Sequence, residues 1–546
     1  MVRFCFFPCC LFLIGCADVV ANDGGGIEDA GTDADICDAV TCECEIDQDC
    51  EAHEVCDATS QPGRICVCAS AYEDSGSGCV FAGAPLAPGF DDAAPWTTTG
   101  AAVLDADGAG IDDPGEVTWL AAAVCDASSV RQTFAMPPYE RAEPLAIEIT
   151  YQGSGDFNQP RPSLALNEKW SRLPIQFTFA TDQRCLGEAG FGGDVEFRID
   201  GDSFGCPSSD GAEELIVDRL EVVRAQDIGL ECPAPGGVRD GDFEGNGSAW
   251  TGLAPADGFA GVEEGIGTGG SRAARLRTAT LCSGPSITGV ASWPLFSTIA
   301  SPALRLVWSG TAGRVLRLVS DDFVFAELTA TGATGTGVAC LPPHMQGTAQ
   351  ELEFALPFTS GACADPDVRD FVLDDVEIVS EPACGDGAFI LDGDFETALS
   401  GTIASGWILT SNEPRGTASV VGGGAQSGNA SLLLAARQEC TGASAQTTIV
   451  VPKPDATGGP ALKYYYRVGN NPETTTSSLP GNGALPEGGL DFAEATVCLD
   501  PNQATKPLNI LFRIDPGGGT CADTFPEEQA RIDNVRVTTD AACPSE

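Results

Sequence analysis

Side chains with reactive or charged groups recur at matching places along this chain. Twelve of its 24 cysteines form three groups of four, with similar spacing inside each group. The groups are Cys125, Cys185, Cys206 and Cys232; Cys282, Cys340, Cys363 and Cys384; and Cys440, Cys498, Cys521 and Cys543. An aspartate precedes the fourth cysteine of each group, at Asp218, Asp374 and Asp533. This recurrence indicates three copies of one domain, whose cysteines would form disulfides in an oxidising compartment.

Residues for acid–base catalysis do not recur in this way. The two histidines, His53 and His344, have no counterparts in the other copies. The chain has neither a zinc-binding His-Glu-x-x-His nor a phosphate-binding Gly-x-x-x-x-Gly-Lys motif. A pair of catalytic carboxylates would be one feature of one domain rather than a motif present three times. We therefore expect no enzymatic activity, with glycan hydrolysis as a distant alternative.

The composition excludes one class of partner. The chain has 79 acidic residues against 28 basic ones, a net charge of −51 at pH 7. Because binding to phosphates requires a basic surface, we expect no nucleic-acid partner. The same charge favours metal cations. The length of 546 residues and the 43% hydrophobic content suffice for several domain cores.

The N-terminus predicts export. Residues 1–15 hold one charge, Arg3, and an apolar stretch too short to span a bilayer, as in a signal peptide. The letters LIGC ending at Cys16 resemble a bacterial lipobox, which implies lipidation of Cys16 after cleavage. The alternative is an ordinary signal peptide with a chance cysteine. Residues 16–36 would form an acidic tether, and the lipid alone would hold the protein at a bacterial membrane, at the outer membrane or cell surface.

The rest of the chain predicts β-strands. Apolar and polar residues alternate with a period of two, 66 glycines and 36 prolines interrupt the pattern, and no long amphipathic helix is predicted. The three copies occupy residues 82–233, 236–385 and 386–546. We expect an all-β protein with three tandem antiparallel β-sandwich or jelly-roll domains, because copies of this size with short strands are typical of that class.

A short cysteine-rich segment, residues 37–81, precedes the three copies. Six of its cysteines resemble those of an EGF-like module, most clearly in the Cys-Val-Cys sequence at Cys66 and Cys68. The resemblance implies the pairs Cys44–Cys56, Cys50–Cys66 and Cys68–Cys79, with Cys37–Cys42 as an extra bridge. Twenty cysteines remain once the signal peptide and Cys16 are set aside, and this even number also favours disulfides.

Each copy opens and closes with a related sequence. The second and third open with GDFE, at 241–244 and 393–396, and close with LDDV at 373–376 and IDNV at 532–535. This pattern resembles carbohydrate-binding modules of the family 4/9 type, which are galactose-binding-like jelly rolls. The resemblance implies binding of carbohydrate or a cell-envelope polymer. MAM-type adhesion domains share the acidic opening, the closing strand and four cysteines, so a structural or protein-binding spacer is the alternative.

In the carbohydrate-binding relatives, the opening acid and the closing aspartate meet and help to hold a structural calcium. The resemblance implies three such pairs here. They are Asp91 with Asp218, Glu244 with Asp374, and Glu396 with Asp533. Calcium takes several oxygen ligands, so two carboxylates and backbone carbonyls would suit it. The alternative is that these acids cap strand ends in solvent.

A large aromatic residue ends a central alternating run in each copy, at Tyr151, Trp308 and Tyr466. On the concave face of a jelly roll these residues would stack on glycans, and they are the candidate ligand-binding residues. A register shift of one residue would instead turn them into the core. The tryptophans that follow the opening sequences are predicted to be core residues. They are Trp96, Trp250 and Trp407.

The second and third cysteines of each copy bracket one alternating stretch, which suggests that they staple a hairpin-like pair of strands. The first and fourth cysteines would then tie an inner strand to the closing strand. The predicted pairs are Cys185–Cys206 with Cys125–Cys232, Cys340–Cys363 with Cys282–Cys384, and Cys498–Cys521 with Cys440–Cys543. Four cysteines allow three pairings, so the other two stay open.

Together these features predict a surface-anchored, non-catalytic lipoprotein that binds carbohydrate through tandem modules. Three weak sites in a row would gain by avidity.

Overall fold

The computed structural model describes residues 89–545 with gaps, and four short strands between residues 54 and 81. The larger gaps are 106–114, 122–127, 155–162, 201–212, 358–363, 469–490 and 515–523. The chain forms two compact units, one of residues 1–51 and 55–67 and one of residues 52–54 and 68–546. The described part is all-β, and its one α-helix is the short α1 (Glu396–Leu399).

The cysteine-rich segment contains two small strand pairs. Strand β1 (Glu54–Asp57) pairs with β2 (Ile65–Cys68), and β3 (Tyr72–Asp74) pairs with β4 (Cys79–Phe81). Cys68 is disulfide-bonded. The other cysteine pairs that the EGF resemblance implies, like the lipidation site Cys16, lie outside the residues whose side chains are described.

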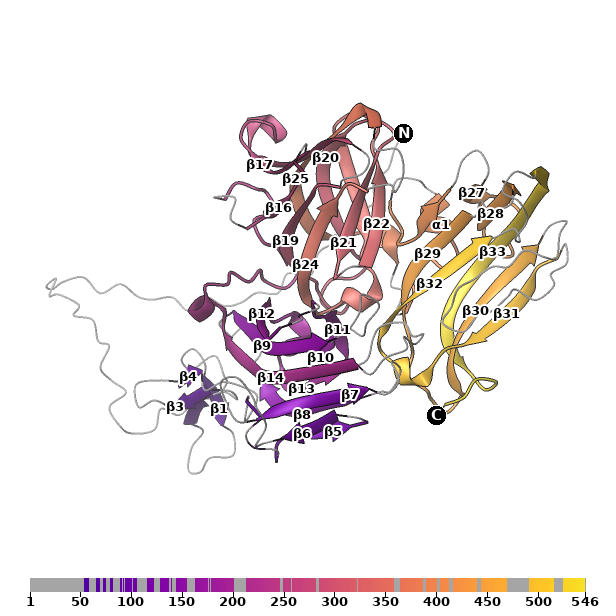
Figure 1. Cartoon of the computed structure of the whole chain (residues 1–546). Coiled ribbons are helices and arrows are strands. Elements are labelled where there is room, and N and C mark those ends of the chain that lie inside the picture. Colours follow the sequence, from indigo (N-terminus) through magenta and orange to yellow (C-terminus); the bar gives the residue numbers. More distant parts are fainter. Residues whose placement is uncertain are drawn as a thin grey trace, which may run out of the picture. The chain divides into compact units, whose positions relative to one another are not determined.

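Repeat 2 consists of two antiparallel sheets that enclose one core (Figure 1). One sheet has the order β15-β19-β24-β21-β22, with β16 also on β19, and the other has the order β17-β18-β25-β20-β23. The strands are β15 (Gly237–Val238), β16 (Thr251–Leu253), β17 (Gly258–Glu263), β18 (Ala273–Thr280), β19 (Ser286–Ser292), β20 (Pro302–Gly310), β21 (Val315–Ser320), β22 (Phe323–Thr329), β23 (Gly335–Cys340), β24 (Ala349–Ala355) and β25 (Ala364–Ser380).

Repeat 1 has the sheets β11-β10-β13-β8-β5 and β12-β9-β14-β7-β6. Its strands are β5 (Thr97–Thr99), β6 (Ala102–Asp105), β7 (Glu116–Ala121), β8 (Ser129–Met136), β9 (Leu145–Ser154), β10 (Ser163–Leu166), β11 (Lys169–Arg172), β12 (Ala180–Cys185), β13 (Gly193–Asp200) and β14 (Glu213–Arg224).

Repeat 3 has the sheets β26-β29-β32 and β27-β28-β33-β30-β31. Its strands are β26 (Ile408–Thr410), β27 (Gly416–Gly422), β28 (Ala430–Gln438), β29 (Ala443–Val450), β30 (Gly459–Val468), β31 (Ala493–Cys498), β32 (Pro507–Ile514) and β33 (Thr524–Asp540).

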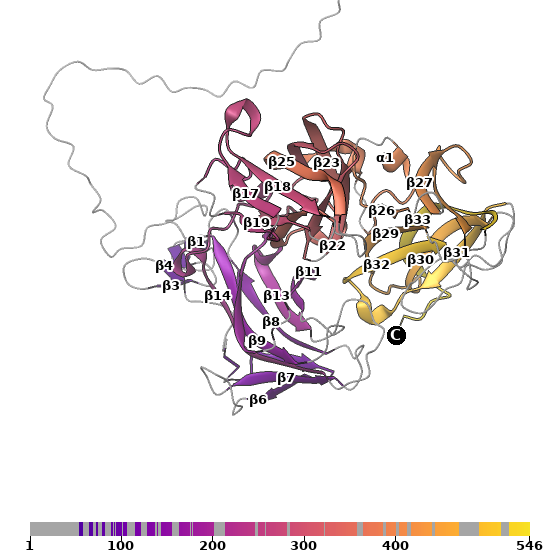
Figure 2. The same cartoon turned by 45° about the horizontal axis from the view of Figure 1, so that its top comes forward.

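The last strand of every repeat lies in the centre of its five-stranded sheet. Strand β25 is hydrogen-bonded to β18 on one side and to β20 on the other, and Figure 2 shows β17 and β18 beside it. Strands β14 and β33 have the same position in repeats 1 and 3. The shared strand order shows that the three copies have one architecture, and it confirms the all-β fold class.

Alternation along the strands explains why the sheets pack in pairs. In β20, Leu304 and Leu306 are fully buried, whereas Arg305 between them is exposed. Burial of one face removes apolar surface from water, which is the main stabilising contribution to such a sandwich.

The tryptophan after each opening turn lies in the core, as predicted. It packs on the phenylalanine of the opening sequence, with ring centroids 4.8–5.0 Å apart. The pairs are Phe90 with Trp96, Phe243 with Trp250, and Phe395 with Trp407.

The disulfides differ from the prediction, because the second cysteine of each repeat bonds to the fourth. The bonds are Cys185–Cys232, Cys340–Cys384 and Cys498–Cys543. Six predicted pairs are therefore wrong: Cys185–Cys206, Cys125–Cys232, Cys340–Cys363, Cys282–Cys384, Cys498–Cys521 and Cys440–Cys543.

The sheet order gives the physical reason for this pairing. In repeat 2, Ala303 of β20 lies opposite Cys340 on one side and opposite Val379 of β25 on the other. The edge strand and the closing strand therefore end at the same border of the sheet. Cys384 follows β25 directly at this border, so it meets Cys340.

The first and third cysteines of each repeat lie outside the described residues, and we predict that they bond to each other. Antiparallel pairing brings Thr280 opposite Ala364 in repeat 2 and Gln438 opposite Thr524 in repeat 3. These positions are close in sequence to the cysteines concerned. The expected bonds are Cys125–Cys206, Cys282–Cys363 and Cys440–Cys521. Mass spectrometry of non-reduced peptides checks them, and a peptide joining Cys282 to Cys440 would contradict the prediction.

Candidate functional site

The opening turn of repeats 2 and 3 lies against the closing strand. In repeat 3, the N–H of Val535 donates to the carbonyl of Gly393 at 2.7 Å. In repeat 2, Val376 donates to Gly241 at the same distance. A Cβ atom at Gly393 would lie only 1.9 Å from the carbonyl oxygen of Val535. The glycine of the opening sequence is therefore required by the close approach of two backbones.

Asp533 is buried beside this turn, at a register shift of β33. One carboxylate oxygen accepts the N–H groups of Gln426 and Ser427 at 2.6 and 3.0 Å. The other accepts the N–H of Asn534 at 2.6 Å. Three backbone donors thus compensate the charge of a carboxylate that is removed from water.

Glu396 binds the same loop between β27 and β28. Its Oε1 atom accepts the N–H groups of Asn429 and Ala430 at 2.5 and 2.8 Å. The opening acid and the closing aspartate of repeat 3 therefore act on neighbouring residues of one loop. Together they fix that loop to the edge of the sandwich.

Repeat 2 has the same arrangement. Glu244 accepts the N–H of Arg272 at 2.8 Å, and the buried Asp374 accepts the N–H of Thr268 at 2.7 Å. The hydroxyl of Ser271 also donates to Asp374, at 3.4 Å. In repeat 1, Asp218 is buried, whereas its predicted partner Asp91 lies outside the described residues.

In repeats 2 and 3 the two carboxylates hold a loop by accepting its N–H groups, an arrangement we call the clamp. They could also supply some of the oxygen ligands of a calcium ion. Two carboxylates give fewer oxygens than the six to eight that calcium takes, so loop carbonyls and water would have to complete a site. The described residues contain no group of three or more His, Cys, Asp or Glu side chains that could share a metal ion. Calcium therefore stays a prediction, with Glu244, Asp374, Glu396 and Asp533 as the residues that would hold it.

Two of the three predicted ligand aromatics lie in the core, so that part of the prediction is wrong. Tyr151 is fully buried, and its hydroxyl donates to the carbonyl of Pro174 at 2.6 Å. Tyr466 is 3% exposed and packs on Tyr464. The register of the central strands turns both rings inwards, so neither can stack on a ligand.

Trp308 is the predicted aromatic that stays partly accessible. It stacks on Phe371 and lines a cavity of about 390 Å³ between the edge strands β22 and β23. Glu327, Thr329 and Thr336 supply polar groups to this cavity.

The outward face of the sheet β27-β28-β33-β30-β31 has aromatic residues that the sequence analysis did not select. Tyr465, the neighbour of Tyr466, points to the opposite side and is half-buried. The guanidinium of Arg536 lies 5.6 Å from the centre of its ring. That of Arg467 lies 5.0 Å from the ring of Phe492. The three consecutive tyrosines at 464–466 could have indicated this surface ring from the sequence. Neighbouring residues of a strand point to opposite faces, so at least one of the three rings must face outwards in either register.

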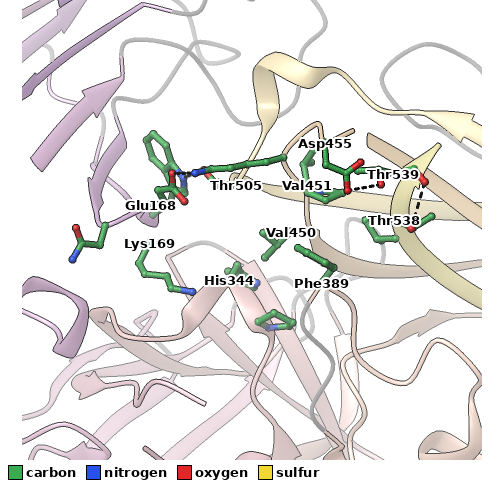
Figure 3. Close-up of a pocket in the computed structure, with 16 residues that line it drawn as sticks. Glu168, Lys169, His344, Phe389, Val450, Val451, Asp455, Thr505, Thr538 and Thr539 are labelled. Carbon is green, nitrogen blue, oxygen red and sulfur yellow. Dashed lines mark hydrogen bonds and ion pairs between the residues drawn. The ribbon is translucent and has the colours of Figure 1, made fainter. Parts of the chain in front are cut away.

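A cavity of about 530 Å³, lined by Trp170 and His344 among others, is a less suitable sugar site (Figure 3). Its aromatic ring, Trp170, is only 3% exposed and donates to the Thr505 hydroxyl at 3.0 Å. The cations of Arg198 and Lys506 already lie 5.1 and 5.2 Å from this ring. Because only 3% of this residue is exposed, its ring offers no open face for stacking, unlike the half-buried Tyr465 and Phe492.

His344 lies in the wall of this cavity. The ring is buried and neither ring nitrogen has a hydrogen-bond partner. Burial, followed by the nearby charge of Arg172, lowers the pKa of His344 to about 3. The ring is therefore neutral at physiological pH, and it hydrogen-bonds to no serine or carboxylate among the described residues. A Gly-x-Ser-x-Gly sequence at 201–205 and His53 lie outside the described residues.

No protein-family model matches this chain, and no curated protein matches it. Solved structures with some likeness include the tandem CBM22 domains of Paenibacillus barcinonensis Xyn10C, at 14% identity and TM-score 0.20, covering 53% of this chain and 94% of that one. Another is the family 11 carbohydrate-binding module of Lic26A-Cel5E from Clostridium thermocellum, at 11% identity and TM-score 0.20, covering 27% and 97%. A third is the GH26-CBM35 mannanase of Podospora anserina, at 14% identity and TM-score 0.15, covering 28% and 32%. Likenesses this distant assign no function, and the fold assignment rests on the strand order.

Proposed function

We propose that this protein is a non-catalytic carbohydrate-binding protein whose sugar site is the outward sheet face of repeat 3. The main support is the pair of half-buried rings Tyr465 and Phe492, each with a guanidinium nearby. The C–H face of a sugar ring packs on an aromatic face by burial of apolar surface, while arginine donates to its oxygens. Such a surface offers contact area together with directional hydrogen bonds.

The test is affinity electrophoresis of the whole protein in gels that contain soluble polysaccharides, followed by calorimetry with the one that retards it most. We expect Tyr465→Ala and Phe492→Ala each to weaken binding about tenfold, because each removes a stacking ring from the site. Both rings lie on the surface side of the sheet, so the melting temperature should change little.

Leu253→Ala is the matched control, since Leu253 is a large apolar side chain of repeat 2 with 72% exposure. This variant should bind like the unchanged protein. Loss of binding in Trp308→Ala but not in the repeat 3 variants would place the site in the cavity of repeat 2. Absence of retardation by every polysaccharide would refute the proposed function.

The second candidate is a structural or protein-binding spacer, and one observation favours it. The corresponding outward face of repeat 2 is covered by ion pairs, with Arg275 between Glu263 and Asp370, and Arg305 on Glu377. Its exposed ring, Phe259, lies on the edge strand β17 opposite Arg277, outside these ion pairs. The repeats therefore differ in their surfaces, and binding through three equal sites is no longer expected.

The proposal includes attachment of the exported protein to a bacterial membrane through a lipid on Cys16. This rests on the lipobox-like sequence alone. Within the described part of the chain, no helix has the length and apolar character needed to cross a bilayer.

A further inference from the structure

Two arginines face each other across neighbouring strands in repeat 3. Arg467 of β30 lies directly opposite Arg531 of β33 on the outward side of the sheet. Like charges at directly opposed positions destabilise a sheet. A carboxylate at either position would replace this repulsion by attraction. Acidic residues are abundant in this chain, where they outnumber basic ones 79 to 28.

The two side chains also converge on one point. A Cβ atom added to Gly424 would lie 2.8 Å from an Nη atom of Arg467 and 2.9 Å from one of Arg531. Arg531 is held there by the carbonyl of Gly423, which accepts from it at 2.8 Å. Residue 424 is a glycine with φ of +69°, and a side chain there would collide with the two guanidinium groups.

Neither arginine has an ion-pair partner among the described residues, although their cationic neighbours do. On the same face, Arg536 is paired with Glu494 and Lys463 with Asp540. Burial, followed by the charge of Arg467, lowers the pKa of Arg531. The sheet therefore maintains a pair of mutually repelling, partly desolvated guanidinium groups that no described residue of the repeat neutralises.

We infer that this arginine pair binds the anionic group of an acidic glycan, a carboxylate or a sulfate. This inference rests on the proposed function and specifies the sugar that the same face binds. Guanidinium groups donate paired hydrogen bonds to carboxylate and sulfate oxygens, and an anion between two of them replaces repulsion by attraction. Arg467 lies over the ring of Phe492, so the anionic group is held next to a stacking surface.

The net charge of −51 determines the conditions under which this local attraction acts. At an ionic strength of 0.15 M, charges more than roughly 8 Å away are largely screened, so distant carboxylates hardly affect an anion at the arginine pair. At low salt the whole chain repels an anionic polymer. Binding is therefore measured at 0.15 M salt or above.

The experiment compares two matched pairs of probes on the whole protein by calorimetry. One pair is an oligogalacturonate and its neutral methyl ester, and the other is dextran sulfate and dextran. We expect the charged member of at least one pair to bind about tenfold or more tightly than its neutral partner. Arg467→Gln and Arg531→Gln should each remove this preference. The pair with the larger preference identifies carboxylate or sulfate as the ligand group.

Arg277→Gln serves as the matched control, because Arg277 is an exposed arginine on the corresponding face of repeat 2. It should leave the preference for charged sugars unchanged. The Arg467→Gln and Arg531→Gln variants should have a melting temperature equal to or above that of the unchanged protein, because each substitution removes a repulsion. If the arginines had a purely structural role, the substitutions would lower the melting temperature instead.

Equal affinity for charged and neutral probes would overturn the inference and leave the proposed function standing. If the preference for the charged probe persists in both Arg467→Gln and Arg531→Gln, the inference is likewise overturned and the proposed function stands. If no sugar of either kind is bound, the proposed function itself fails.

Discussion

Replacing Asp533 by alanine is expected to lower the free energy of unfolding of repeat 3 by about 3 kcal/mol. The substitution leaves the N–H groups of Gln426, Ser427 and Asn534 without their acceptor at a buried site. An unsatisfied buried donor costs about 1–3 kcal/mol, and water that enters the space left by the carboxylate recovers part of that loss. Thermal unfolding followed by calorimetry measures the effect.

The same experiment tests the calcium prediction. Asp394→Ala is the control, since Asp394 is an exposed carboxylate of the same turn, and its loss should change stability by less than about 0.5 kcal/mol. If calcium binds at Glu396 and Asp533, added calcium raises the melting temperature of the unchanged protein, a chelator lowers it, and Asp533→Ala responds to neither. Equal melting with calcium and with chelator would show that backbone N–H groups alone satisfy the clamp.

The second large effect is expected for Gly393→Ala, which should destabilise repeat 3 by about 3 kcal/mol. The new methyl group would lie 1.9 Å from the carbonyl oxygen of Val535, so the opening turn and the closing strand must separate. Their separation also weakens the hydrogen bond from Val535 to Gly393. Chemical denaturation followed by tryptophan fluorescence reports the change, because Trp407 packs on the opening Phe395.

A glycine in an open position supplies the control for this substitution. A Cβ atom at Gly335 on β23 would meet nothing within 4 Å, so Gly335→Ala should leave the stability nearly unchanged. Comparable losses in Gly393→Ala and Gly335→Ala would mean that the close approach of backbones is not the cause.

The repeated architecture could be predicted from the sequence because the cysteines, the phenylalanine and acid of the opening turn, and the closing aspartate keep the same order in each copy. The disulfide pairing could not. Cys340 and Cys384 meet because β23 and β25 both lie next to β20, and this adjacency depends on the strand order of the sheet. Sequence distance between cysteines contains no information about which strands are neighbours.

Only part of the candidate site on repeat 3 could be predicted from the sequence. The run of tyrosines at 464–466 indicates that one ring faces outwards, but the choice between Tyr465 and Tyr466 depends on register. The opposition of Arg467 and Arg531 depends on register too, because the pairing of β30 with β33 shifts between Lys463 and Tyr465. A shift of this kind, a β-bulge, changes which residues meet across strands without a clear mark in the sequence.

The central position of each closing strand has a consequence for biosynthesis. The ribosome synthesises β25 and its equivalents last, after the two strands between which they insert. Until then each repeat has two interior strands with open hydrogen-bonding edges, which is the state most prone to aggregation. These long-range pairings favour slow folding, repeat by repeat. The fourth cysteine is synthesised at the end of each domain, so its disulfide with the second cysteine can form only after the closing strand has been made. This bond then covalently links the edge strand to the end of the closing strand.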